Sequence, residues 1–202
     1  MMLRPTYLKF AASLAFAFCS LLGFSQEYTL QNSSSTTVSG TSTLHDWTVD
    51  VKNQTGKVSI AAKKIMEDAI KAGSITNLSV TVFASDIMSR KGKTMDNKMH
   101  KALKMELFPT ITYTLNNPVG FELINKDGHV LENFSGILSI AGVERTVSTT
   151  VRAHYNNKKL SLSGELPIKL SDFNIEPPTA MFGQIETGND IIVNFNLDFS
   201  DQ

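Results

Sequence analysis

The four histidines are the side chains best suited to catalysis or metal binding, because imidazole titrates near neutral pH and ligates metals. They stand at His45, His100, His129 and His154. No two have the spacing of a metal-binding pair, i,i+4 on a helix or i,i+2 on a strand. His45 is followed by Asp46, but neighbouring residues of a strand point to opposite faces, so adjacency makes no catalytic pair. The pattern favours scattered surface histidines, and we expect no metal site.

Other catalytic signatures are missing from the sequence. There is no G-x-S-x-G elbow and no glycine-rich phosphate loop. A lipid hydrolase would need a serine, a histidine and a carboxylate to converge in space, which no motif suggests. The sequence therefore predicts that the protein is not an enzyme and uses no cofactor. A basic stretch over residues 90–104 leaves two interpretations open, a solvated helix surface or peripheral contact with membrane headgroups.

The N-terminus has the features of a secretory signal peptide. Two basic residues and no acid precede an apolar run over residues 10–24, which is shorter than the about 20 residues needed to span a bilayer. Gly23 and Ser25 occupy the −3 and −1 positions of a small-x-small cleavage site. We expect a signal peptide over residues 1–25, cleavage after Ser25, and a periplasmic or secreted domain over residues 26–202.

Charge and cysteine content narrow the class of protein further. The 202 residues carry 19 basic and 19 acidic side chains, which gives no reason to expect a nucleic-acid partner. The single cysteine, Cys19, lies in the predicted signal peptide. It follows Phe18, where a lipoprotein signal needs a small residue, so we expect no lipid anchor. The mature chain then has no disulfide, and a packed core must hold it together.

Apolar and polar residues alternate with period 2 through most of the mature chain, which is typical of β-strands with one buried face. The apolar members of the clearest runs are Trp47, Val49 and Val51; Leu78, Val80 and Val82; Ile111, Tyr113 and Leu115; Val147, Val151 and Tyr155; Leu160, Leu162, Leu166 and Ile168; and Ile191, Val193, Phe195, Leu197 and Phe199. Short turn signals between the runs indicate antiparallel neighbours. Eight or more strands predict an all-β barrel or sandwich.

Three segments depart from this alternation. Residues 94–104 have helical spacing with Met95 and Met99 on one face, and Thr94 is the expected N-cap. Residues 61–72 suggest a second short helix. Residues 171–189 form a long apolar segment without a period, which is typical of a lid or binding loop.

Three stretches together resemble the YceI-like family of bacterial polyisoprenoid-binding proteins. They are GTSTLHDWTV at residues 40–49, KMHKALKMELFPTITY at residues 98–113, and FSGILSIAGVERTVSTTV at residues 134–151. The last is similar to a hairpin motif of the family, G-x-L-x-I-x-G-V. The resemblance runs in order through essentially the whole mature chain. It implies an extended antiparallel, lipocalin-like barrel of about eight strands with one or two short helices.

The resemblance also implies a carrier for an isoprenoid lipid, of quinone or polyprenyl type, held in an apolar cavity. Such a ligand needs no charged partner along its chain, since burial of methylene-sized groups supplies the affinity. The candidate lining residues are Trp47, Val49, Leu78, Val80, Val82, Ile111, Tyr113, Phe195 and Leu197, and the candidate lid or mouth residues are Met99, Leu103, Phe108, Phe173, Met181 and Phe182. The sequence leaves open, for each of them, whether it contacts ligand or packs in a filled core. The alternative is therefore a solid-cored β domain that serves surface interaction or assembly.

Overall fold

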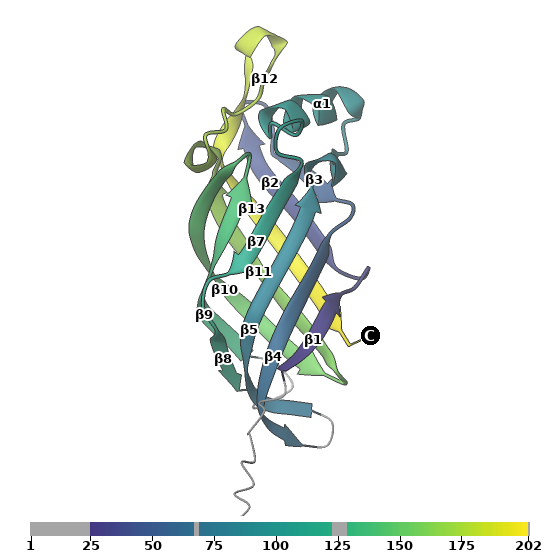
Figure 1. Cartoon of the computed structure of the whole chain (residues 1–202). Helices are drawn as coiled ribbons and strands as arrows, with labels where there is room; N and C mark the ends of the chain where they lie inside the picture. The colour runs from purple at the N-terminus through teal and green to yellow at the C-terminus, as the bar shows by residue number, and fades with distance from the viewer. Residues whose placement is uncertain (1–24, 67–68, 123–128, 202) are drawn as a thin grey trace, which may run out of the picture.

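The computed structural model of the protein describes residues 25–66, 69–122 and 129–201. The predicted signal peptide, apart from Ser25, lies outside these residues. In the described part, almost every element is an antiparallel strand, and a single α-helix stands at one end (Figure 1).

Eight strands form a closed barrel, as the sequence predicts. In order around the wall they are β1 (Ser25–Leu30), β4 (Thr55–Met66), β5 (Ala69–Phe83), β7 (Thr110–Leu115), β9 (His129–Ile140), β10 (Val143–Asn156), β11 (Lys159–Lys169) and β13 (Ile185–Ser200). The ring closes where β1 meets β13, with Leu30 opposite Phe199. β11 pairs with β13 along its whole length.

A short side ribbon completes the wall beside the other half of β13. It consists of β2 (Ser35–Ser42), β3 (Trp47–Val51) and β6 (Ile87–Ser89), and β2 pairs with β13 with Val38 opposite Val193. The chain thus passes from β1 to β2 along the same edge of β13. The strand on the other side changes as well, because β1 pairs with β4 whereas β2 pairs with β3.

The two ends of the barrel differ. Helix α1 (Lys93–Ala102), β12 (Thr179–Ala180) and the short helices η1 (Ala84–Asp86), η2 (Leu170–Phe173) and η3 (Met181–Gly183) belong to one end, named here the cap end (Figure 1). The opposite end carries the hairpin between β4 and β5 together with β8 (Val119–Glu122), and is named the hairpin end.

The inward side chains form two clusters. The first lies towards the hairpin end and contains Tyr28, Val58, Ile60, Ile75, Leu78, Leu115, Leu131, Phe134, Val151, Ala153, Tyr155, Leu160, Leu162, Leu197 and Phe199. The second lies towards the cap end and contains Leu138, Ile140, Ala141, Leu166, Ile168, Leu170, Phe173, Ile175 and Ile191. Both follow the period-2 pattern, since inward positions alternate with solvated ones along each strand.

All three local predictions need correction. The loop predicted over residues 171–189 ends earlier, because β13 begins at Ile185. The helix expected over residues 61–72 is wrong, because residues 61–66 belong to β4 and residues 69–72 belong to β5, with Ile65 opposite Ile70. Pairing across a sheet overrides the helix propensity of its alanines and lysines. Helix α1 is present, but it begins after Gly92, whose φ is 86°, and ends at Ala102, so Thr94 is not the N-cap.

Candidate functional site

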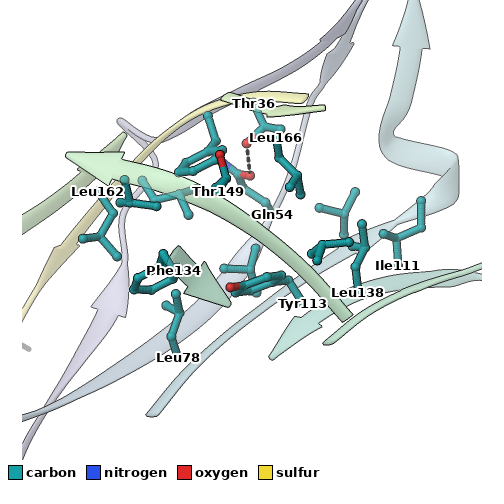
Figure 2. A pocket seen from close by; sticks show the side chains of 16 residues that line it. Thr36, Gln54, Leu78, Ile111, Tyr113, Phe134, Leu138, Thr149, Leu162 and Leu166 are labelled. Carbon is teal, nitrogen blue, oxygen red and sulfur yellow. Dashed lines mark hydrogen bonds between the residues drawn. The ribbon is translucent and has the colours of Figure 1, made fainter. Parts of the chain in front are cut away.

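An apolar cavity lies inside the barrel between the two core clusters (Figure 2). Its volume is about 130 Å³, and its wall comes from strands all around the barrel. The sixteen lining residues are Thr36, Gln54, Leu78, Val80, Val82, Ile111, Tyr113, Phe134, Leu138, Val147, Thr149, Val151, Leu162, Leu166, Phe195 and Leu197. No charged side chain is among them.

The size of the cavity defines what it accepts without rearrangement. An engineered cavity of about 150 Å³ lined by leucine, isoleucine and phenylalanine stays dry and binds benzene. The cavity here is of that order, so it is suited to an apolar group rather than to water. Several wall side chains, such as Val80, Val82 and Phe195, are half-buried, and a longer ligand requires such side chains to turn aside.

Two aromatic rings lie flat along the wall because a glycine stands beneath each of them. A Cβ at Gly136 would collide with the ring and hydroxyl of Tyr113, and a Cβ at Gly164 would approach the Phe195 ring to 2.9 Å. Gly164 and Phe195 are direct cross-strand partners. Large side chains at either glycine would push these rings towards the lumen. The glycines therefore help to keep the middle of the barrel hollow.

The Tyr113 phenol is neutral under ordinary conditions. Its ring stacks on Phe134 with centroids 6.5 Å apart and an interplanar angle of 14°. Burial raises the pKa of Tyr113 to about 12, since a low-dielectric surrounding disfavours the phenolate. The cavity thus carries no ionised group over the physiological range.

The polar groups of the wall are an amide and hydroxyls. Thr36 Oγ1 donates a hydrogen bond of 2.8 Å to Gln54 Oε1 (Figure 2). The Thr149 hydroxyl donates to the carbonyl oxygen of Glu165. The amide nitrogen of Gln54 is buried and has no hydrogen-bond partner within the described part of the chain.

Aromatic side chains close the hairpin end of the lumen. The hydroxyls of Tyr28 and Tyr155 lie 2.9 Å apart, and the two rings meet edge to face with centroids 6.1 Å apart. Tyr28 Oη donates in turn to Gln26 Oε1 over 2.7 Å. Burial and the bond with Tyr28 raise the pKa of Tyr155 above its usual value. Packed aromatic side chains therefore plug this end of the barrel.

Helix α1 and the segment before β13 cover the cap end. Lys98 Nζ donates to the Thr179 carbonyl at 3.3 Å, and Lys104 Nζ donates to the Asn174 carbonyl at 3.4 Å. The buried Asp96 carboxylate accepts from Ser89 N at 2.6 Å, and this hydrogen bond lowers the pKa of Asp96. These contacts fix the helix to β6 and to the neighbourhood of β12.

Seven of the nine lining residues predicted from the sequence stand in this wall: Leu78, Val80, Val82, Ile111, Tyr113, Phe195 and Leu197. Trp47 does not, because its ring lies over Gly40 and its Nε1 donates to the Thr41 carbonyl at 2.9 Å, beside a second groove. Val49 is buried in β3 and lies outside the wall. Whether any of them contacts a ligand stays a prediction.

None of the predicted lid residues lines the cavity. Phe173 is 1% exposed and belongs to the cap-end cluster, so it is core. Leu103 packs against the same cluster. Phe108 lies against Gly142 in the turn between β9 and β10. Met99 is half-buried on α1, whereas Met181 and Phe182 are exposed.

Nine wall residues were not proposed from the sequence: Thr36, Gln54, Phe134, Leu138, Val147, Thr149, Val151, Leu162 and Leu166. Four of the apolar ones, Val147, Val151, Leu162 and Leu166, occupy inward positions of alternating runs, which is a usable signal. Thr36 and Gln54 carry no such signal, because polar residues beside a turn are ordinarily solvated.

The contacts described for His45 and His100 are to backbone carbonyls. His45 Nδ1 lies 2.9 Å from the Asp46 carbonyl, and His100 Nε2 lies 2.9 Å from the Ile87 carbonyl, beside β6. Across residues 25–66, 69–122 and 129–201, no group of three His, Cys, Asp or Glu side chains is placed to hold a metal ion. The same residues contain no helix long and apolar enough to cross a membrane.

A family model for the YceI-like domain matches residues 28–199, which includes every strand of the cavity wall. The chain belongs to the YceI-like family. No curated protein matches it. Among solved structures, this YceI-like chain is similar to BcnA of Burkholderia cenocepacia, with 18% identity, a TM-score of 0.60, and coverage of 82% of this chain and 95% of that one.

Two further structures share the barrel of this YceI-like protein. A polyisoprenoid binding domain from Saccharophagus degradans, implicated in plant cell wall breakdown, has 13% identity and a TM-score of 0.61, covering 87% of this chain and 98% of that one. The Campylobacter jejuni YceI protein has 19% identity and a TM-score of 0.55, covering 76% and 84%. At these identities the likeness shows the fold.

Proposed function

We propose that this YceI-like protein binds and carries an isoprenoid lipid, of quinone or polyprenyl type, in the lumen of its barrel. The observation that carries the proposal is the uncharged, apolar cavity between the two core clusters. The name of the Saccharophagus degradans neighbour, a polyisoprenoid binding domain, supports the same class of ligand. A solid-cored interaction domain is disfavoured, because its barrel would be filled along its whole length.

The affinity in this account comes from apolar burial. Each methylene-sized group removed from water contributes about 0.8 kcal/mol, and the wall offers valine, leucine, isoleucine and aromatic contacts. The chain enters the existing cavity with one apolar unit and extends further as half-buried wall side chains rotate. We assign no chemical step to the protein, because its wall contains neither a charged residue nor a histidine.

We place the protein in the periplasm or outside the cell. The proposal rests on the basic start, apolar run and small-residue exit of residues 1–25. Edman sequencing of exported protein tests it, with Gln26 expected as the first residue. An unprocessed N-terminus on protein recovered from the cytoplasm would contradict it.

We also propose that the cap end contacts anionic membranes while ligand is exchanged. Phe182 and Met181 are exposed beside β12, and lysines surround α1. Residues 90–104 contain Arg90, five lysines and one acid, Asp96, and the Asp96 side chain is buried. Exposed aromatic and cationic side chains together suit a headgroup region.

Native mass spectrometry tests the proposed ligand most simply. Protein exported by a bacterial host is measured before and after extraction with organic solvent, and the extract is analysed for prenyl lipids. We expect an adduct that extraction removes and an isoprenoid in the extract. Identical ligand-free masses in both samples, from a host that makes isoprenoid lipids, would overturn the proposal.

A further inference from the structure

One polar atom in the cavity has no partner. Gln54 directly precedes β4, and its side chain lines the lumen (Figure 2). It lies near the level at which the neighbour of β13 changes from β1 to β2. Its amide oxygen is held by Thr36 Oγ1 at 2.8 Å. Its amide nitrogen is buried with no acceptor in the described residues.

A buried amide nitrogen of this kind is expected to have a hydrogen-bond acceptor. Buried side-chain donors are nearly always hydrogen-bonded, because an unmade bond in an apolar surrounding leaves the cost of desolvation uncompensated. The bond from Thr36 fixes the rotation of the amide and keeps the nitrogen end free. A donor fixed in this way is pre-organised for an acceptor that arrives with the ligand.

Water is a poor candidate for that acceptor. A buried water needs two to four polar partners. Apart from Gln54, the only polar side chains of the wall are Thr36 and Thr149, and their hydroxyl protons are already donated, to Gln54 and to the Glu165 carbonyl. A water there would have only their hydroxyl oxygens as further side-chain partners, and it would leave the apolar remainder of the cavity empty. A ligand oxygen attached to an apolar chain satisfies the amide and fills the cavity at once.

We propose that Gln54 Nε2 donates a hydrogen bond to an oxygen of the ligand, so that the cavity selects a prenyl-type chain bearing a carbonyl or ether oxygen over a plain hydrocarbon. The inference rests on the proposed lipid-binding function and deepens it. Gln54 acts as a specificity residue, and apolar contacts supply the remaining affinity.

The test compares ligands that differ in one acceptor. The probes are a C18 prenyl hydrocarbon and two ketones of the same chain, with the carbonyl at the chain end or in its middle. Binding of each is measured to the delipidated wild-type protein, to Gln54→Met, and to Gln31→Met. Gln31 is the matched control, because its amide nitrogen donates to the Thr29 carbonyl, outside the cavity wall.

We expect the wild type and Gln31→Met to bind one of the ketones about tenfold more tightly than the hydrocarbon. In Gln54→Met this preference disappears, while hydrocarbon affinity is unchanged or higher. If all proteins bind all three ligands alike, or if Gln54→Met keeps the preference, the inference is overturned and the proposed function stands. If the wild type binds none of the probes, the proposed function fails as well.

A spectroscopic readout keeps the test independent of how Gln54→Met folds. The carbonyl stretch of an isotope-labelled ketone moves to lower frequency when the oxygen accepts a hydrogen bond. We expect that shift on binding to the wild type. An unshifted, apolar-environment carbonyl band in the bound ketone would contradict the proposal.

Discussion

The hairpin-end core and the cavity wall are built from the same strands by the same alternation, yet one is filled and the other is hollow. Val58, Ile60 and Leu160 in the filled region are 0% exposed, whereas Val80 and Val82, inward on the neighbouring strand β5, are half-buried beside open space. Alternation therefore decides which side chains face inward. It does not decide whether side chains from opposite walls are large enough to touch and fill the lumen.

Side-chain size accounts for the difference. Tyr28, Tyr155 and Phe199 belong to the packed cluster at the hairpin end, where the rings of Tyr28 and Tyr155 meet edge to face. In the middle of the barrel the aromatic rings of Tyr113 and Phe195 lie along the wall over glycines, and many other inward side chains are valines or threonines. A barrel of about eight strands is just wide enough for either outcome.

Truncating one valine in each region gives the largest contrast. Val58→Ala removes two methyl-sized contacts from a fully packed site, and we expect a loss of about 2 kcal/mol in the free energy of unfolding. Val82→Ala removes groups that already face the cavity, so its cost stays below about 1 kcal/mol. Urea denaturation measures both. Equal losses would mean that the cavity is not open in solution.

A pair of tyrosine variants separates the plug from the wall. Tyr155→Phe removes the hydroxyl that lies 2.9 Å from Tyr28 Oη, and we expect a cost of about 1 kcal/mol with ligand binding unchanged. Tyr113→Phe, in the cavity wall, costs less because that hydroxyl stands at the open lumen. Thermal denaturation of both variants checks the order, and a reversed order would refute this division of roles.

Stability is expected to fall at alkaline pH. Burial raises the pKa of Tyr113 from 10.0 to about 12 and raises that of Tyr155 as well. A raised pKa in the folded state means that the unfolded chain loses its phenolic protons first, so the stabilisation is complete below pH 10. It is lost as pH rises from there through about 12. Melting temperatures measured at successive pH values should be flat between 8 and 9.5 and then decrease; an unchanged melting temperature at pH 11 would contradict the burial of these phenols.

The smallest expected effect concerns the membrane. Phe182→Ser should reduce sedimentation of the protein with vesicles of phosphatidylglycerol and phosphatidylcholine by a few-fold, and added salt should weaken the remaining binding. Val130→Ser is the control, because Val130 is also an exposed apolar residue but lies on β9 away from the cap end. Equal sedimentation of the two variants would exclude the cap end as the contact surface.

The barrel and much of its lining follow from the sequence because alternation is a local signal. Residues such as Leu78, Val80 and Phe195 sit inward wherever their strands pair in register. The structure of the cap end cannot be predicted in the same way, since residues 171–189 have no hydrophobic period. Nothing in the local sequence indicates that Phe173 is buried in the core while Phe182 is exposed.

Gln54 shows a different limit. The sequence around it, Asn-Gln-Thr-Gly, suggests a turn between strands, and a glutamine there is ordinarily solvated. Its inward position depends on the side ribbon, which brings Thr36 of β2 within hydrogen-bond distance. This contact between β2 and the residue before β4 depends on the pairing of β2 with β13. No periodic pattern in the sequence predicts it.

The hollow lumen as the binding site is tested most directly by tryptophan at adjacent positions of β5. Val80 faces the cavity, and Thr81 faces the other side of the sheet; Leu78 is unsuitable, because at 2% exposure it belongs to the filled cluster. Native mass spectrometry counts the prenyl chains bound to delipidated Val80→Trp, Thr81→Trp and wild type, with circular dichroism confirming the barrel. We predict one chain on the wild type and on Thr81→Trp, and at least tenfold weaker binding to folded Val80→Trp. Equal binding to both variants would contradict the account.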